Sequence, residues 1–332
     1  MAATTFYSCL GPDRLPEPLT PPAAIDGQVD TRYFSRALAA MDRELQPGGL
    51  TVYLTFDTKA LPSYGDDVVA VLIGDEWARV PDYLPRVRAV FRNLSARPNL
   101  GAPIRSPAGL SALLPAGRAA IRGLPARFRH VGGPSPATQI ELPIGTFNVL
   151  DLPLTPFAER GADVFFAGSV AHAPGRLAAL KAKVKPKDLT REAMLRAVDR
   201  LRERPGVAVD VHVTGSFKES AAADPGEYSR ALMDSRLALV PRGATTETHR
   251  FFQALKYGCV PVTDTVPPVW FYEQAPVVRL RHWDELEGVV LDLLADPERL
   301  EGLHRRALSW WETACSEDAV GRYMARMLGQ RE

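Results

Sequence analysis

Apolar and polar positions follow two different periods along this chain, and the pattern is clearest in the second half. From Asp163, the sequence DVFFAGSV is typical of a buried strand, and short apolar runs recur at 207–215, 236–243, 259–263 and 276–280. Apolar residues three or four positions apart predict helices at 175–184, 191–206, 227–235, 247–258 and within 283–329. Strands alternating with helices at this pitch predict βαβ units and a parallel, doubly wound α/β sheet.

The first half shows fewer elements. Residues 31–45 have helical spacing, and 51–56 and 68–74 are strand-like, the latter too continuously apolar for a strand with one wet face. A Pro- and Gly-rich region, 98–136, matches no regular element. Because 332 residues exceed what one core usually serves, we expect two domains, 1–155 and 156–332, the second ending in a helical tail.

Composition excludes several classes of protein. Apolar residues make up 46% and charged residues 24%, as in ordinary globular proteins and unlike disordered or fibrous chains. Forty Lys and Arg against 39 Asp and Glu leave a net charge of +1, so neither nucleic acid nor an anionic membrane is an expected partner. No apolar stretch approaches the length of a membrane span and the start does not resemble a signal peptide. Three dispersed cysteines without a CxxC motif fit a reducing, cytoplasmic location.

Candidate chemistry gathers where the predicted strands end. Ligands of an open parallel sheet bind beyond the carboxyl ends of its strands. Three such ends carry small or polar residues: Gly168-Ser169 followed by Arg176, then Thr214, and then the loop from Pro241 through Arg242 and Gly243 to Arg250.

The loop before residue 250 has the features of a phosphate site. Thr246 or Thr248 can cap the following helix, and free amides at that terminus can face a phosphate. Arg242 and Arg250 offer guanidinium forks for diphosphate oxygens, and Gln253, one turn on, can bond a ribose hydroxyl. These residues predict a nucleotide-diphosphate site, although an ordinary capped helix with surface arginines shows the same residue types.

Several familiar motifs are absent. No G-x-G-x-x-G opens a βα turn, and no G-x-x-x-x-G-K-[ST] occurs, which argues against dinucleotide-dependent dehydrogenases and P-loop enzymes. No Asp-x-Asp pair is available to bridge a divalent cation and a sugar diphosphate, and the six histidines are dispersed. We therefore expect no metal site and no cofactor.

Two segments resemble the signature of exostosin-like glycosyltransferases. Residues 235–243 (SRLALVPRG) and 248–262 (THRFFQALKYGCVPV) are similar to a strand with a Pro-x-Gly turn, a Ser-x-Arg-x-x-Glu-Ala helix and a Gly-Cys-Ile/Val-Pro-Val strand. FFAGS with the arginine that follows it, at 165–176, fits more loosely. In the first half only GDE (74–76) and VFRN (90–93) look similar.

The resemblance implies a GT-B architecture: two Rossmann-like domains facing each other across a cleft, with a nucleotide-sugar donor in the second and an acceptor in the first. It implies inversion at the sugar carbon and places Arg250 against the leaving diphosphate. The family's ribose-binding glutamate maps to Gln253, which loses the charge-assisted bond. Glu247 can compensate, or it only complements the helix dipole.

A transferase also needs a base for the acceptor hydroxyl. Asp75 and Glu76 follow a buried strand and are the candidates, with Asp57 behind them; strand-end capping or a salt bridge with Arg79 is the alternative.

We therefore expect a metal-independent glycosyltransferase that uses a nucleotide-diphosphate sugar as co-substrate and a glycan, lipid-linked or small-molecule acceptor. The alternatives are another nucleotide-sugar enzyme, such as an epimerase, on the same scaffold, and a non-catalytic nucleotide- or sugar-binding protein.

Overall fold

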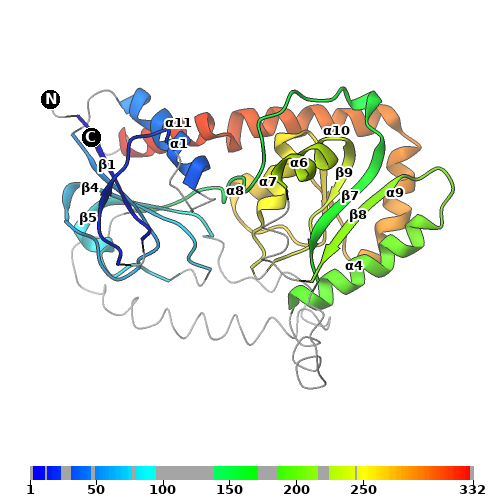
Figure 1. The fold of residues 1–332 in the computed structure, drawn as a ribbon, viewed down its shortest axis with the longest axis horizontal. Coiled ribbons are helices and arrows are strands. Elements are labelled where there is room, and N and C mark those ends of the chain that lie inside the picture. The colour runs from blue at the N-terminus through cyan, green and yellow to red at the C-terminus, as the bar shows by residue number, and fades with distance from the viewer. Residues whose placement is uncertain are drawn as a thin grey trace, which may run out of the picture. The chain divides into compact units, whose positions relative to one another are not determined.

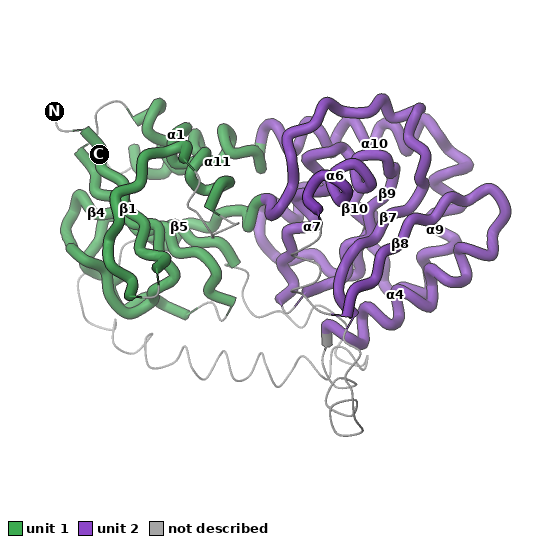
Figure 2. Tube along the Cα trace, in the orientation of Figure 1, with its two compact units in different colours: residues 1–98, 116–145, 314–332 green, residues 99–115, 146–313 purple. Residues whose placement is uncertain are grey.

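The chain forms two units, each built on its own sheet. The computed structural model describes residues 3–11, 13–23, 31–45, 49–76, 79–94, 138–170, 186–215, 224–243 and 245–329. Unit 1 holds Met1–Pro98, Ala116–Gly145 and Ala314–Glu332, and unit 2 holds Asn99–Pro115 and Thr146–Thr313 (Figure 2). The predicted helix at 175–184 and the whole of the unassigned region 98–136 lie outside the described residues.

Unit 1 contains a six-stranded sheet in the order β2-β1-β3-β4-β5-β6. Its strands are β1 (Thr5–Cys9), β2 (Glu17–Pro18), β3 (Thr51–Thr55), β4 (Gly65–Leu72), β5 (Val87–Arg92) and β6 (Thr138–Glu141). All neighbours are parallel except the short pair β1–β2. The two predicted strands are β3 and β4. The pattern of residues missed β1, β5 and β6, because arginines interrupt β5 and β6 is the mainly polar TQIE.

Helices α1 (Thr31–Leu45) and α11 (Glu317–Gly329) lie along each other in unit 1 (Figure 1). Their backbones approach closely at Gly321, where an added Cβ would lie 2.5 Å from the Ala37 carbonyl oxygen. The Tyr33 hydroxyl also donates to the Cys315 carbonyl at 2.5 Å. The last helix therefore falls in unit 1, whereas the sequence-based division assigned it to the second domain and drew the boundary at 155/156 rather than 145/146.

Unit 2 contains a five-stranded, all-parallel sheet in the order β11-β10-β9-β7-β8. Its strands are β7 (Ala162–Ser169), β8 (Val209–Thr214), β9 (Ser235–Leu239), β10 (Val260–Thr263) and β11 (Val278–Arg279). From β7 the chain proceeds to β8 on one side and then to β9 on the other. This reversal creates a topological switch point between β7 and β9, the place where open α/β sheets bind ligands.

Helices cover both faces of the unit 2 sheet. The helices and short turns of this unit are η2 (Phe157–Glu159), α4 (Pro186–Arg202), α6 (Pro225–Met233), α7 (His249–Lys256), α8 (Trp270–Glu273), η3 (Trp283–Glu285), α9 (Leu286–Leu294) and α10 (Pro297–Trp310). A π-helical turn, Trp311–Cys315, follows α10.

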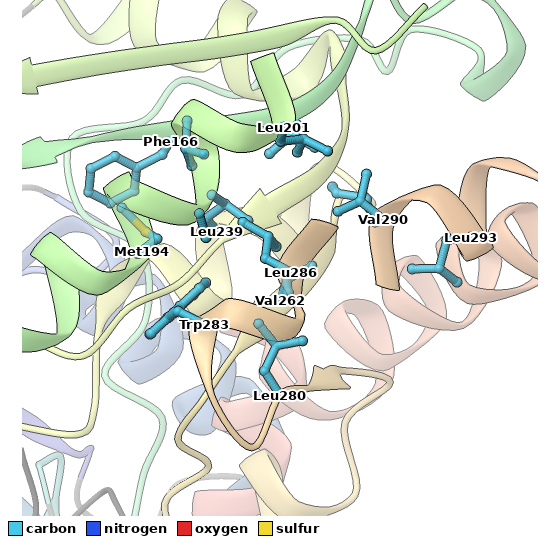
Figure 3. Packing of buried hydrophobic residues seen from close by; sticks show 14 of the residues in the cluster. Phe166, Met194, Leu201, Leu239, Val262, Leu280, Trp283, Leu286, Val290 and Leu293 are labelled. Atoms are coloured by element: carbon cyan, nitrogen blue, oxygen red, sulfur yellow. The ribbon is translucent and has the colours of Figure 1, made fainter. Parts of the chain in front are cut away.

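Alternate residues of the strands face these two helical layers. Phe166 and Leu239 pack with Met194 and Leu201 of α4 and with Leu286 of α9 (Figure 3). On the other face, Phe165 and Ala238 pack with α6 and α7. The doubly wound α/β prediction is thereby confirmed, and the continuous apolar run of β7 is explained because the strand is buried on both faces.

No helix in the described ranges combines the length and apolar character needed to cross a bilayer.

Candidate functional site

Arg191 of α4 joins the two strand ends that flank the switch point. Its Nη1 donates to the carbonyl of Ser169, the last residue of β7, and its Nε donates at 3.4 Å to the carbonyl of Arg242, which lies just beyond β9. Arg191 is only 3% exposed. It was not predicted, because α4 lies between β7 and β8 and its arginines look like those of any amphipathic surface helix.

Arg250, from the first turn of α7, reaches the end of β7. Its Nε donates at 2.6 Å to the Ala167 carbonyl, and its Cζ lies 5.4 Å from the centre of the Phe166 ring. A Cβ added at Gly168 would lie 2.9 Å from that Cζ. Gly168, a predicted site residue, therefore leaves the space that the guanidinium occupies. Arg250 is half-buried here, not on the exposed helix start that the sequence suggested.

These two guanidinium groups lack an ion pair with any carboxylate of the described residues. Burial, and after it repulsion from Arg250, lower the pKa of Arg191 to about 9, while Asp188 acts in the opposite direction. Burial also lowers the pKa of Arg250. Neighbouring buried cations without ion-pair partners are costly, and a bound anion removes that cost. The charges at the switch point therefore suit a bound anion.

Arg242 adds a third guanidinium beyond β9, with a carboxyl group in its surroundings. Arg242 is 6% exposed, and burial lowers its pKa while Asp264 opposes that shift. Asp264 is the first residue after β10, and burial raises its pKa to about 6 against the effects of Trp283 and Arg242. Asp264 was not predicted, although its place directly after the strand CVPVT was the available signal.

Thr248 holds the N-cap position of α7, but its side chain makes no capping hydrogen bond. Its hydroxyl is buried with no partner. On the other side of the switch point, Lys187 Nζ donates at 3.2 Å to the Ser169 hydroxyl. Ser169 and Thr248 are both predicted site residues. The Ser169 hydroxyl thus lies at the end of β7, which Arg191 contacts, and the Thr248 hydroxyl lies at the start of α7, which carries Arg250.

Gln253 makes two contacts inside unit 2. Its Nε2 donates to the Phe147 carbonyl, and its Oε1 accepts a 2.8 Å hydrogen bond from the Tyr228 hydroxyl. Burial raises the pKa of Tyr228 to about 12, so that hydroxyl stays protonated and remains a donor. The contact between Gln253 and a ribose stays a prediction. A ribose hydroxyl would have to bond the same amide atoms that already contact Phe147 and Tyr228.

The remaining predicted residues of unit 2 divide by position. Thr214 ends β8 in register with Ser169. Pro241 and Gly243 flank Arg242 beyond β9, and Glu247 is 4% exposed before α7. Arg176 lies outside the described residues.

The candidate bases lie at strand ends of unit 1. Asp75 is 2% exposed and accepts from Arg79, through its backbone N–H at 2.7 Å and its Nε at 3.0 Å, and from Arg92 Nη2 at 3.0 Å. It therefore holds a structural ion pair, the alternative that the sequence left open, with Arg92 of β5 as an unforeseen partner. Glu76 is exposed.

Asp57 also has a partner, since Arg14 Nη1 lies 2.6 Å from its Oδ2. Burial acts to raise the pKa of Asp57, but the hydrogen bond from the Lys59 N–H and the contact with Arg14 outweigh it and leave the pKa lowered. Within the ranges described, no three His, Cys, Asp or Glu side chains are grouped as metal ligands.

Comparison with protein families finds one match. Residues 184–269 match the family model of the RXYLT1 C-terminal domain. This segment contains α4, β8, β9, α7 and β10, and so both Arg191 and Arg250. No curated protein sequence matches the chain.

Solved structures with a similar arrangement are distant in sequence. They include the GtfA/B complex (12% identity, TM-score 0.44, 81% of this chain and 58% of that one) and the pneumococcal O-GlcNAc transferase GtfA in complex with UDP and GlcNAc (10%, 0.42, 90% and 59%). AviGT4, a glycosyltransferase involved in avilamycin A biosynthesis, is 13% identical at a TM-score of 0.39, with 99% and 98% coverage. The chain spans under two thirds of the length of the first three structures it matches.

Both units are of the α/β class, with a mainly parallel sheet in unit 1 and an all-parallel sheet in unit 2. Over its switch-point segment the chain is similar to the C-terminal domain of an exostosin-like glycosyltransferase.

Proposed function

We propose that this protein is a glycosyltransferase that moves a sugar from a nucleotide-diphosphate sugar to an acceptor hydroxyl. The observation that carries the proposal is the pair Arg191 and Arg250, two guanidinium groups that bond carbonyls at the end of β7 and have no carboxylate ion-pair partner in the described residues. A diphosphate supplies the negative charge that both lack. The family match over 184–269 supports the same reading.

The two arginines have a role in the chemical step as well as in binding. As the bond between the sugar carbon and the diphosphate oxygen breaks, negative charge grows on the departing diphosphate. Guanidinium groups already held by the carbonyls of Ala167 and Ser169 stabilise that charge without rearranging. Arg242 and the Thr248 hydroxyl extend the same cationic, donor-rich surface.

The acceptor hydroxyl must lose a proton to a base, and we place this base in unit 1. Of the two candidates, Glu76 is the better one because its carboxylate is exposed, whereas Asp75 is bound by Arg79 and Arg92. Direct attack by the deprotonated hydroxyl on the face opposite the diphosphate inverts the sugar carbon.

Metal independence belongs to the same proposal. Because guanidinium groups can neutralise the diphosphate, activity should survive excess EDTA. No cofactor is needed beyond the nucleotide-sugar co-substrate, and the acceptor is a glycan, a lipid-linked sugar or a small molecule.

The direct test is acceptor-dependent release of nucleoside diphosphate. Purified protein is incubated with UDP-, GDP-, ADP- and TDP-sugars, with and without acceptor mixtures, beside two variants: Arg250→Ala and, as a matched control, Arg299→Ala, an exposed arginine of α10 paired with Asp292. Release that requires acceptor and fails only in Arg250→Ala supports the proposal. Nucleotide binding without release in any mixture would instead identify a non-catalytic binding protein.

A further inference from the structure

The side chains near the switch point include one carboxyl group, that of Asp188, which a bound anion would not stabilise. Asp188, in the first turn of α4, is 3% exposed, and its Oδ2 is buried with no hydrogen-bond partner among the residues that the structure describes. A buried carboxylate oxygen without a donor is destabilising. A negative charge beside a diphosphate site is also unfavourable by itself, so its place there requires a separate reason.

The neighbours of Asp188 on α4 fix where it lies. Lys187, the residue before it, donates to the Ser169 hydroxyl at 3.2 Å, and Arg191, one turn after it, donates to the Ser169 carbonyl. Asp188 is thus on the stretch of α4 that meets the end of β7, close enough to Arg191 to raise the pKa of that guanidinium.

The opposite helix shows the same combination of groups. The start of α7 carries Arg250 and the Thr248 hydroxyl, which is also buried and unpartnered. Each of the two helices therefore supplies one guanidinium without an ion-pair partner and one polar atom without a hydrogen-bond partner. A ligand that satisfies all four groups needs both anionic oxygens and hydroxyl groups.

We propose that Asp188 accepts a hydrogen bond from a sugar hydroxyl of the ligand whose diphosphate lies on Arg191 and Arg250. The inference rests on the proposed function and adds to it a residue that reads the hydroxyl-bearing part of the substrate. That hydroxyl belongs either to the ribose of the nucleotide or to the transferred sugar, and both offer the same donor.

Calorimetric titration of the full chain with two classes of probe tests this assignment. Inorganic pyrophosphate has the anionic oxygens but no sugar hydroxyl. The second class contains UDP, GDP and ADP, their 2′-deoxy counterparts, which lack one ribose hydroxyl, and the matching nucleotide sugars, which add the hydroxyl groups of the transferred sugar. The variant is Asp188→Asn, and the control is Asp199→Asn, an exposed carboxylate of the same helix paired with Arg202. If Asp188→Asn does not fold, the smaller Asp188→Ser replaces it.

Asp188→Asn should leave the Kd for pyrophosphate unchanged or lower, because a negative charge has gone. It should raise the Kd for the hydroxyl-bearing ligand by about 10- to 100-fold, as expected for a lost bond to a charged acceptor. An effect already present with the nucleoside diphosphate and absent with its 2′-deoxy form assigns the ribose. An effect confined to the nucleotide sugar assigns the transferred sugar.

If Asp188→Asn changes the Kd for pyrophosphate and for every nucleotide ligand by the same factor, or changes none of them, the role of Asp188 is overturned. The proposed diphosphate site would be unaffected by that result. Failure of wild-type protein to bind pyrophosphate or any nucleotide would instead remove the proposed function, and the role of Asp188 with it.

Discussion

Arginine side chains lie at both ends of β7, but they make different contacts there. Arg160, before the amino end of β7, donates to the carbonyls of Ser235 at 2.7 Å and Tyr257 at 2.5 Å, and these bonds tie together three segments of the core. Arg191 and Arg250, at the carboxyl end, also bond carbonyls but stand beside each other. Arg160 thus bonds carbonyls inside the core, whereas Arg191 and Arg250 bond the strand end at the switch point, where open α/β sheets bind ligands.

Replacing Arg250 with alanine should weaken binding of nucleoside diphosphate by about 1.5–3 kcal/mol, the range for a hydrogen bond to a charged group. The fold should survive, because the change relieves the repulsion on Arg191. Calorimetry on the folded variant measures the loss, with Arg299→Ala as the control. Unchanged affinity would remove Arg250 from the site.

Asp75 and Glu76 should respond differently to loss of charge. Asp75→Asn breaks a buried ion pair with Arg92 and should lower the free energy of unfolding by about 3–5 kcal/mol. Glu76→Gln should leave stability unchanged and lower kcat by about 10²–10⁴ if this carboxylate is the base. Urea unfolding and single-turnover rates separate the two effects. Full turnover by Glu76→Gln would place the base elsewhere in unit 1.

The acid stability of the protein should depend on Asp264. Burial raises its pKa to about 6, whereas an aspartate in the unfolded chain titrates near pH 4. The native state therefore binds more protons than the unfolded state between these values, and the stability that this gives is full below about pH 4 and is lost as pH rises through about 6.

Asp264→Asn removes this titration. Relative to wild type, the variant should gain about 2 kcal/mol in unfolding free energy between about pH 4 and pH 8. Urea unfolding across this range measures the difference. A difference that is the same at every pH would show that Asp264 is not desolvated.

At the scale of elements, the end of β7 has room for the Arg250 guanidinium because Gly168 has no side chain. Gly168→Ala should displace the Arg250 guanidinium, because the new Cβ would lie 2.9 Å from Cζ, and so reduce diphosphate affinity. Gly288→Ala on α9 is the control, since a Cβ there meets nothing within 4 Å and alanine favours the helix. Nucleotide titration of both variants tests this: equal affinities would show that the strand end tolerates a side chain.

The sequence predicted Arg250 as a residue of the candidate site but did not predict Arg191. The Pro-x-Gly turn and the helix with Arg250 follow each other in the chain, so their motif could be read directly. Arg191 lies on α4, which follows β7, and only the pairing of β7 with β9 brings it to the loop beyond β9. Likewise, no local signal near Asp75 revealed Arg92 of β5 as its partner.

For the whole molecule, alternation of strands and helices in the second half predicted a doubly wound α/β sheet, and the length of the chain predicted two domains. The predicted helix at 31–45 and the strands β3, β4 and β7 agree closely with the structure. The assignment of the last helix could not come from its own residues. Its apolar face needs some partner, and only the fold shows that α1 of unit 1 provides it.

The central claim is that Arg191 and Arg250 form a diphosphate site at the switch point of unit 2. Calorimetric titration of wild-type protein and of an Arg191→Met, Arg250→Met double variant with UDP, GDP, ADP, TDP and CMP tests it most directly. We expect saturable binding of at least one nucleoside diphosphate by wild type, and a loss of about 3–6 kcal/mol, two charged hydrogen bonds, in a double variant that still unfolds cooperatively. Unchanged affinity in the folded double variant, or no binding of any of these nucleotides by wild type, would contradict the claim.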